Sequence, residues 1–276
     1  MNILAMAAAL QRLGGGALKL GPGLQEPIAG TMEFGFFGEV SAQELIDGES
    51  LASLLGVTGI GTVNMPALKA GWLKFTREGK VLFISKRALR YSLSWSQLDS
   101  VNAVNGSRIE TIGDNGFSVR LMSGGNGTPS TAAGGEWDDL IKRIVRPLDA
   151  GLGEWATYTK VELDIANGTA AETLCMETTS SGSTYIVGRG RNVLGTYASV
   201  LKTSANVWNA WRPVLELVQP SASVLGVTEV SYVPAITLHS VASVDGDVVD
   251  RLAVPSDISY TSEPHTSVAD IGHSTI

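Results

Sequence analysis

Glycine interrupts this chain so often that long regular elements are excluded over much of its length. The 276 residues include 32 glycines and 10 prolines. Glycine loses more conformational entropy on folding than any other residue, and proline lacks the backbone N–H that a helix interior needs. Hydrophobic residues still make up 44% of the sequence, which is too many for a disordered chain. We therefore expect a globular, turn-rich protein built from short helices and strands.

The apolar pattern predicts a β-rich α+β fold. Phe75, Val81 and Phe83 bracket a turn at Gly79, which is typical of a β-hairpin. Residues 117–122 alternate between apolar and polar side chains, as a half-buried strand does. The chain therefore favours strands over helices.

Three segments carry helix signals. Residues 136–146 place apolar side chains at helical spacing, and Pro147 ends the segment. The sequences SAQE (41–44) and SWSQ (94–97) have the spacing of a capping box, in which the first and last side chains satisfy free backbone N–H groups. We expect short helices to begin at these two sites, the first ending at Gly48 and followed by a further turn or two over residues 49–55.

The tryptophans divide the chain into three regions. All six lie between residues 72 and 211, and all three histidines follow them. We expect an N-terminal assembly or docking arm at 1–70, a Trp-bearing central domain at 71–218 and a C-terminal β-rich extension at 219–276. The arm is rich in glycine and has little core of its own, which suggests that it packs on another surface.

Charge, cysteine content and hydropathy limit the partners and the compartment. The net charge of −7 provides no basic field for a phosphate backbone, so nucleic acid is not an expected partner. Cys175 is the only cysteine, which excludes an intrachain disulfide and favours folding in a reducing cytoplasm.

No apolar run approaches the roughly 18 residues that span a bilayer, so we expect no membrane insertion. The N-terminal MNILAMAAAL lacks a positive charge before its apolar stretch, and we interpret it as a docking helix rather than a secretory signal.

The sequence offers little catalytic machinery. A Walker loop and a GxSxG elbow are absent, and the histidines lie outside the Trp-bearing region, so we expect no catalytic triad, no metal and no cofactor there. Carboxylates remain a possibility, because glycan hydrolysis needs only two of them. The candidates lack a decisive spacing: Glu136, Asp138, Asp139, Glu154 and Asp164.

Aromatic and cationic side chains can form a sugar-binding surface. Flat aromatic faces stack on the apolar face of a pyranose, and cations are attracted to aromatic rings. Trp155, in a Gly-rich loop, and Trp208 are the two tryptophans that we expect to be exposed. Together with Arg189 and Arg191 they are the candidate surface or glycan-binding residues.

Five short motifs follow one another in the central region, and a sixth lies in the arm. The five are GWLKF (71–75), EGKVLFISKRALRYSLSW (78–95), FSVRLMSGG (117–125), GGEWDDLIKRI (134–144) and AWRPVLELV (210–218), and the arm contributes FFGEVSAQELIDGESLA (36–52). This series resembles structural proteins of tailed-bacteriophage virions, among tail and tail-fibre components. It is similar, more remotely, to the C-type-lectin-like fold of formylglycine-generating enzymes and phage tropism determinants.

The resemblance implies a C-type-lectin-like central domain. In that fold a terminal strand with an aromatic-Arg-Pro motif closes a small twisted sheet. The fold residues implied here are Trp72, Trp95, Trp137 and the motif Trp211, Arg212 and Pro213. Formylglycine generation relies on a cysteine pair or copper thiolates, which Cys175 alone does not supply. Calcium-dependent lectins share a Glu-Pro-Asn motif, which this sequence lacks. Neither activity is therefore carried over.

The function that the resemblance implies is structural. It is that of a non-enzymatic virion protein of the tail, at the tail tip, baseplate or fibre, which can contribute to host attachment. Such proteins fold in the host cytoplasm and assemble as homo-oligomers. Residues 1–70 and 219–276 would contact other virion proteins, and the central domain a host surface glycan. Two alternatives remain open: a capsid decoration protein, and a glycan-active depolymerase that uses Glu136 or Glu154.

Overall fold

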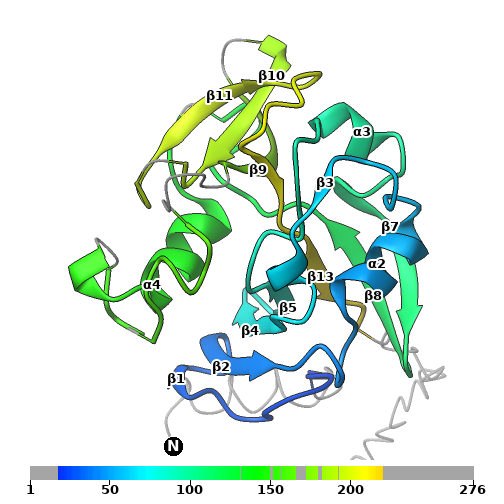
Figure 1. Ribbon diagram of the computed structural model, residues 1–276. Helices are drawn as coiled ribbons and strands as arrows, with labels where there is room; N and C mark the ends of the chain where they lie inside the picture. Colours follow the sequence, from blue (N-terminus) through cyan, green and yellow to red (C-terminus); the bar gives the residue numbers. More distant parts are fainter. Residues whose placement is uncertain are drawn as a thin grey trace, which may run out of the picture. The chain divides into compact units, whose positions relative to one another are not determined.

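The strands of the described residues form two sheets that are joined by short helices and turns (Figure 1). The computed structural model describes residues 18–219, except 131, 150, 151, 156, 166–171, 180, 181 and 192. The expected C-terminal extension, apart from Gln219, and the apolar N-terminal segment lie outside the described residues. Within the described part the fold is β-rich with few short helices, as the apolar pattern predicts.

The large sheet has seven strands, and every neighbouring pair in it is antiparallel. In spatial order they are β1 (Ala29–Gly30), β2 (Phe34–Val40), β4 (Trp72–Arg77), β5 (Lys80–Ser85), β13 (Val214–Leu217), β8 (Asn115–Arg120) and β7 (Asn105–Ile112). The last strand of the described residues, β13, thus lies between β5 and β8 within the sheet.

The hairpin predicted around Gly79 is confirmed. In the β4–β5 pair Arg77 lies opposite Lys80, which leaves Glu78 and Gly79 as a two-residue turn. Both turn residues have positive φ, 53° and 75°, as a type I′ turn requires. Gly79 adopts this conformation without a steric penalty because it has no Cβ.

The small sheet has six strands and includes one parallel pair, β12 with β9. In spatial order they are β11 (Tyr197–Leu201), β10 (Gly182–Arg189), β9 (Glu172–Thr179), β12 (Asn209–Trp211), β6 (Arg90–Tyr91) and β3 (Thr62–Val63). Only Arg212 and Pro213 separate β12 from β13, so the chain passes directly from the small sheet into the large one.

The helices within the described residues are short and lie between the strands. They are α2 (Gly48–Leu55), α3 (Trp95–Asp99), α4 (Lys142–Ile144), the 3₁₀ turns η1 (Met65–Ala67) and η3 (Pro147–Asp149), and η2 (Trp137–Ile141), which is π-helical. The helix predicted at 136–146 is therefore present as η2 and α4 together. Ser94 and Gln97 form the predicted capping box at the start of α3, which confirms that helix start.

The prediction of a helix at Ser41 is wrong. The Ser41 N–H and the Glu44 N–H do bond to each other's side chains, at 3.0 and 3.2 Å, but the chain makes only a turn there. The helix begins at Gly48, the residue expected to end it, and it covers residues 49–55, where a further turn or two was expected. Asp47 is the reason, because its carboxylate accepts hydrogen bonds from two free N–H groups of the next turn and so caps a helix there.

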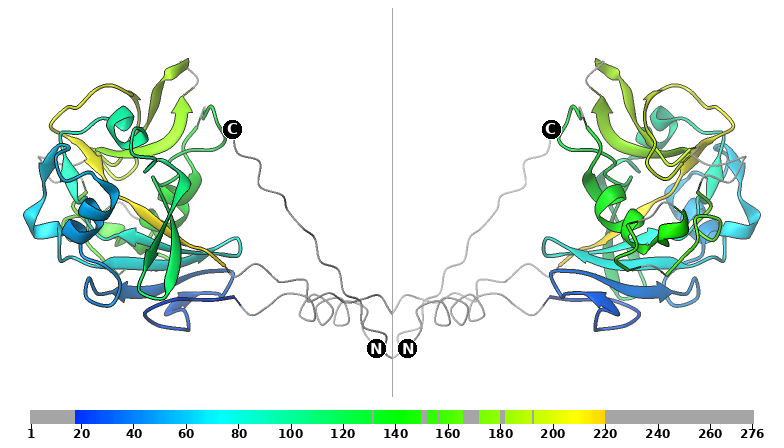
Figure 2. Two further views of the ribbon diagram at one scale, coloured as in Figure 1. Left: turned by 90° about the vertical axis from the view of Figure 1, so that its right-hand side faces the viewer. Right: turned by 90° about the vertical axis from the view of Figure 1, so that its left-hand side faces the viewer.

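The described part of the arm packs into the same interior as the central region. β2 pairs with β4, and the two lie side by side in both views of Figure 2. Phe37 and Val40 of β2 are fully buried in a cluster with Trp72 and Phe83. Residue 71 therefore does not separate two cores within the described chain.

A buried lysine holds the segment before β1 in place. The Lys74 side chain is fully buried on β4, and its Nζ donates hydrogen bonds to the carbonyl oxygens of Pro22 and Leu24 at 2.9 and 2.5 Å. Burial lowers the pKa of Lys74 to about 8, because the charged form is disfavoured away from water. The contact fixes residues 22–24 to the centre of the large sheet.

Candidate functional site

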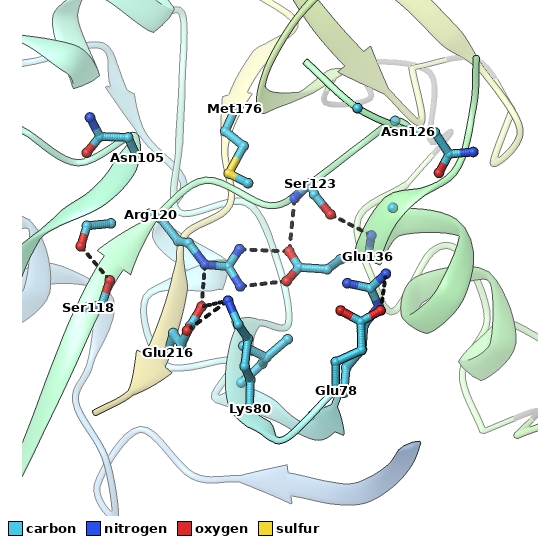
Figure 3. Close-up of a pocket in the computed structure, with 16 residues that line it drawn as sticks. Glu78, Lys80, Asn105, Ser118, Arg120, Ser123, Asn126, Glu136, Met176 and Glu216 are labelled. Atoms are coloured by element: carbon cyan, nitrogen blue, oxygen red, sulfur yellow. Dashed lines mark hydrogen bonds and ion pairs between the residues drawn. The ribbon is translucent and has the colours of Figure 1, made fainter. Parts of the chain in front are cut away.

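A cavity of about 570 Å³ opens beside the large sheet and is lined mainly by polar side chains (Figure 3). The β4–β5 turn, the start of β7, strands β8 and β13, and the glycine-containing segments 123–127 and 135–136 form its walls. Met176 of β9 also lines it. Several chain segments that lie far apart in the sequence thus meet at one site.

Arg120 is the centre of an ion-pair network in this cavity. Its Nη1 and Nη2 donate to the two oxygens of Glu136 at 2.8 and 2.5 Å, and its Nε donates to Glu216 at 2.9 Å. Lys80 lies 3.1 Å from the other oxygen of Glu216. Burial alone would lower the pKa of Arg120, but Glu136 and Glu216 outweigh it and raise that pKa. The two terminal nitrogens of the guanidinium bind the Glu136 carboxylate in a bidentate pair, and the Nε atom binds the Glu216 carboxylate.

Glu136 is fixed in position by the neighbouring loop as well as by Arg120. The Ser123 N–H donates to its Oε2 at 2.9 Å, and the Glu136 N–H donates to Ser123 Oγ at 2.8 Å. Its side chain is 4% exposed and accepts three hydrogen bonds. These bonds hold the Glu136 carboxylate in a fixed position in the wall of the cavity.

The charges that line the cavity compensate one another. Three side chains are cationic and three are anionic: Arg77, Lys80 and Arg120, and Glu78, Glu136 and Glu216. Each of them takes part in an ion pair. Around these pairs the amides of Asn105 and Asn126 and the hydroxyl of Ser118 offer hydrogen-bond donors and acceptors. Such a lining suits an uncharged polar ligand better than an ion.

A buried carboxylate supports the cavity loop from behind. Glu177 on β9 accepts a hydrogen bond from the Gly124 N–H at 3.0 Å. Burial raises the pKa of Glu177 to about 7, and that hydrogen bond opposes the rise only in part. Cys175 is fully buried on the same strand, and burial raises the pKa of its thiol. A Cβ atom on Gly124 would lie 2.3 Å from the Cys175 sulfur. Any residue with a side chain would therefore clash there, and only glycine allows the loop to lie this close to β9.

Two of the four candidate glycan-binding residues are buried, which corrects the expectation that they form a surface. Trp155 is 8% exposed and packs against Phe34 with ring centroids 5.1 Å apart, because its loop folds back onto β2. Arg189 is fully buried on β10 and is paired with Asp138. Neither side chain is available to a ligand in this structure.

Arg191 and Trp208 lie together at the surface. The guanidinium carbon of Arg191 is 3.8 Å from the centroid of the Trp208 ring, and both side chains are partly exposed. The contact is a cation–π pair. One face of the Trp208 ring is therefore already covered. Neither residue lines the cavity.

The fold residues implied by the resemblance lie in or near the interior. Trp72, Trp137 and Trp211 are buried, whereas Trp95 is partly buried with Lys202 4.3 Å from its ring. Arg212 is fully buried and donates hydrogen bonds only to backbone carbonyls, those of Ser85, Lys86 and Leu163, at 3.0, 2.6 and 2.6 Å. Burial lowers the pKa of Arg212 to about 10. Pro213 is buried beside it.

The carboxylates considered for catalysis are not brought together in the cavity. Of the five, only Glu136 lines it. Asp138 pairs with Lys142 and Arg189, Asp139 pairs with Arg77, and Glu154 pairs with Arg143. Asp164 accepts hydrogen bonds from Tyr91 and Asn64. These carboxylates have structural partners throughout the fold.

Comparison with known proteins gives no family for this chain: no family model, no curated protein and no solved structure matches it. Within the described ranges no three His, Cys, Asp or Glu side chains are grouped so that they could hold a metal ion. No helix in the same residues is long and apolar enough to cross a membrane.

Proposed function

We propose that the protein is a non-enzymatic structural component of a tailed-phage virion, located in the tail at its tip, baseplate or fibre. In this proposal the central region is a C-type-lectin-like domain that braces the assembly or contacts the host surface. The proposal rests on the motif series described above, and it predicts that the motifs act as one structural unit.

The observation that supports this proposal is the ion-pair network of the cavity. Lys80, Arg120, Glu136 and Glu216 each come from a different motif of the series, and they form one continuous network. The last motif also supplies Arg212, whose guanidinium bonds to the carbonyls of Ser85 and Lys86 in the second. The residues that carry the resemblance are thus those that build the interior and the cavity.

Location in the particle tests the proposal directly. Antibodies raised against the protein and coupled to gold should label purified phage particles from the source of the sequence at the tail end in electron micrographs. Label spread over the head would favour the capsid decoration protein instead. Particles that remain unlabelled, and that lack the protein after denaturation, would contradict a virion function.

We further propose, as part of this function, that a neutral saccharide of the host surface binds in the cavity. Its compensated charges and its exposed amides fit hydroxyl groups, which both donate and accept hydrogen bonds. Asn126→Ala should weaken binding of extracted host polysaccharide about three- to tenfold, the equivalent of one hydrogen bond. Asn206→Ala is the matched control, because Asn206 is exposed outside the cavity.

Titration calorimetry of both variants measures this effect. Equal affinities for the two variants would place the saccharide elsewhere, and the Trp208 surface would be tested next. Release of new reducing ends by the purified wild-type protein would contradict the non-enzymatic proposal and favour the depolymerase. In that case Glu154→Gln, which changes an exposed residue, should abolish release without loss of folding.

A further inference from the structure

We propose that the edge of the large sheet at β7 pairs with β7 of a second copy of this chain around a two-fold axis at Ile109. This inference does not depend on the virion proposal. Within the described part of the chain, β7 is the terminal strand of the sheet, and no strand follows it on its outer side. The pairing would join two large sheets into one.

β7 is longer than the other edge strands among the described residues. It has eight residues, whereas β1 and β3 have two each and β11 has five. Short edge strands, proline, charged side chains (above all lysine) and bulges are the usual protections against pairing. Asn105–Ile112 contains neither proline nor lysine. A bulge interrupts its register only between Asn105 and Arg108.

The free backbone groups of β7 can be assigned from its neighbours. The Gly116 carbonyl accepts from the Val218 N–H at 2.9 Å and so faces β13 rather than β7. Thr111 lies opposite Gly116. In an antiparallel pair, when the backbone groups of one residue point away from the opposite residue, the backbone groups of that opposite residue point away as well. The N–H and C=O of Thr111 therefore point outward. With a period of two and no bulge between them, those of Ile109 do as well.

The side chains of β7 are self-complementary about Ile109. When Ile109 faces Ile109 of the second copy, Arg108 faces Glu110 and Ser107 faces Thr111. Pairing centred on Arg108 or on Glu110 would instead place two like charges opposite each other, which is destabilising. Arg108 and Glu110 form a 2.6 Å ion pair on one face, and Arg108 also donates to the carbonyl oxygens of Leu54, Leu55 and Val101. In the proposed register each Arg108 keeps these bonds and gains Glu110 of the second copy as a further neighbour. The charges thus select one register.

The outer face of this edge is apolar at its centre. Ile109 is 62% exposed and Val218 is 40% exposed. Both approach Gly116, which has no side chain between them. In the proposed register the two Ile109 side chains meet at the axis and cover each other. One strand pair buries a small interface, so we expect a dimer that dissociates on dilution.

Cysteine cross-linking tests both the partner and the register. Ile109→Cys should form a disulfide-linked dimer under mild oxidation, because residues opposite each other in a hydrogen-bonded pair have Cα atoms about 5.5 Å apart, within disulfide range. Cys175 is fully buried, so the wild-type protein provides a low background on a non-reducing gel.

Thr111→Cys is the matched control for register. It lies on the same strand and is also exposed, but its counterpart in the second copy is about 14 Å away along the strand, too far for a disulfide. We expect several-fold more cross-linked dimer from Ile109→Cys than from Thr111→Cys. Equal cross-linking at the two positions, or none at either, would overturn the proposal.

Light scattering of the full chain at rising concentration provides the second measurement. The wild-type mass should rise toward that of a dimer, and Ile109→Lys, which places two like charges at the axis, should shift the rise to at least tenfold higher concentration. Circular dichroism should show that this exposed substitution leaves the fold unchanged. A wild-type protein that stays monomeric, or a dimer that Ile109→Lys does not weaken, would contradict pairing at β7.

Discussion

At the scale of single residues, Arg212 is a buried side chain that donates hydrogen bonds to three main-chain carbonyl groups. It binds carbonyls of the β5 end and of residue 163 without any carboxylate partner. A lysine has one terminal nitrogen and cannot reproduce the two-sided fork. Arg212→Lys should therefore leave a buried carbonyl unpaired and lower the free energy of unfolding by about 3 kcal/mol.

Urea denaturation measures this loss, and Arg191→Lys is its control. Arg191 is partly exposed and stacks on Trp208, so its replacement should cost less than about 1 kcal/mol. If both substitutions had the same small effect, Arg212 would not anchor the crossing between the sheets.

Glu177 predicts a dependence of stability on pH. Its pKa is raised to about 7 in the folded protein and lies near 4.3 in an unfolded chain. Between these values the folded state holds more protons, so the contribution of Glu177 to stability falls as pH rises from about 4 through about 7. In Glu177→Gln, which can still accept from the Gly124 N–H, the melting temperature should fall less between pH 5 and pH 8. Identical pH profiles for wild type and variant would contradict the buried position.

Trp155 is a residue whose environment differs from the one its sequence neighbours predict. Its Gly-rich surroundings suggested exposure, but the loop returns it to Phe34 and Phe75. The sequence does not indicate that Arg120 and Glu216 are site residues, although they lie in the motifs at 117–125 and 210–218. They are 96 residues apart, and only the position of β13 beside β8 brings them into contact. Glu136 was noted as a carboxylate, yet its partner could not be found from spacing alone.

At the scale of elements, the two capping boxes give different structures from nearly the same pattern. Ser94 Oγ accepts from the Gln97 N–H, and a helix follows. At Ser41 the same bonds close a turn, and the helix begins only after Asp47, which caps it. The pattern alone therefore predicts a turn, and the residues after it decide whether a helix begins.

Removal of the two caps should have unequal effects on stability. Ser94→Ala should lower the free energy of unfolding by about 1 kcal/mol, because Ser94 is buried at the start of α3. Ser41→Ala should cost less, since no helix depends on that turn. Chemical denaturation of the two variants compares them, and a larger loss at Ser41 would contradict this interpretation.

Strands were predicted where apolar residues alternate and missed where polar residues are buried. The β4–β5 hairpin, β8 and β13 follow the apolar pattern. β9 does not, because Glu172, Thr173, Glu177 and Thr179 are buried along it and hide its period. β7 begins with Asn105-Gly106, a residue pair typical of turns, and the structure places it at the bulge of the strand, with Gly106 at φ 82°.

At the scale of the whole molecule, the shared core changes what is expected of the N-terminal region. β2 contributes Phe37 and Val40 to the interior beneath Trp72. A chain that lacks residues 1–40 loses this strand and exposes β4, so it should not fold. A chain that lacks only residues 1–17 keeps every contact described here and should fold as the full chain does.

Expression of the two truncated chains and their thermal unfolding test this expectation. The shorter truncation should give one cooperative transition, whereas the longer one should aggregate or show no transition. A folded chain without residues 1–40 would mean that the arm and the central domain are independent, as the division at residue 71 suggested.

The place of β13 in the large sheet also affects how the chain can be made. Synthesis proceeds from the N-terminus, so the β4–β5 and β7–β8 hairpins leave the ribosome well before the strand that lies between them. Until residues 214–217 are added, each hairpin has an open edge facing the gap. Unpaired edges of this kind promote aggregation during folding. A nascent chain of this protein is therefore most vulnerable just before β13 is translated, and it is at that stage that a chaperone would protect it most.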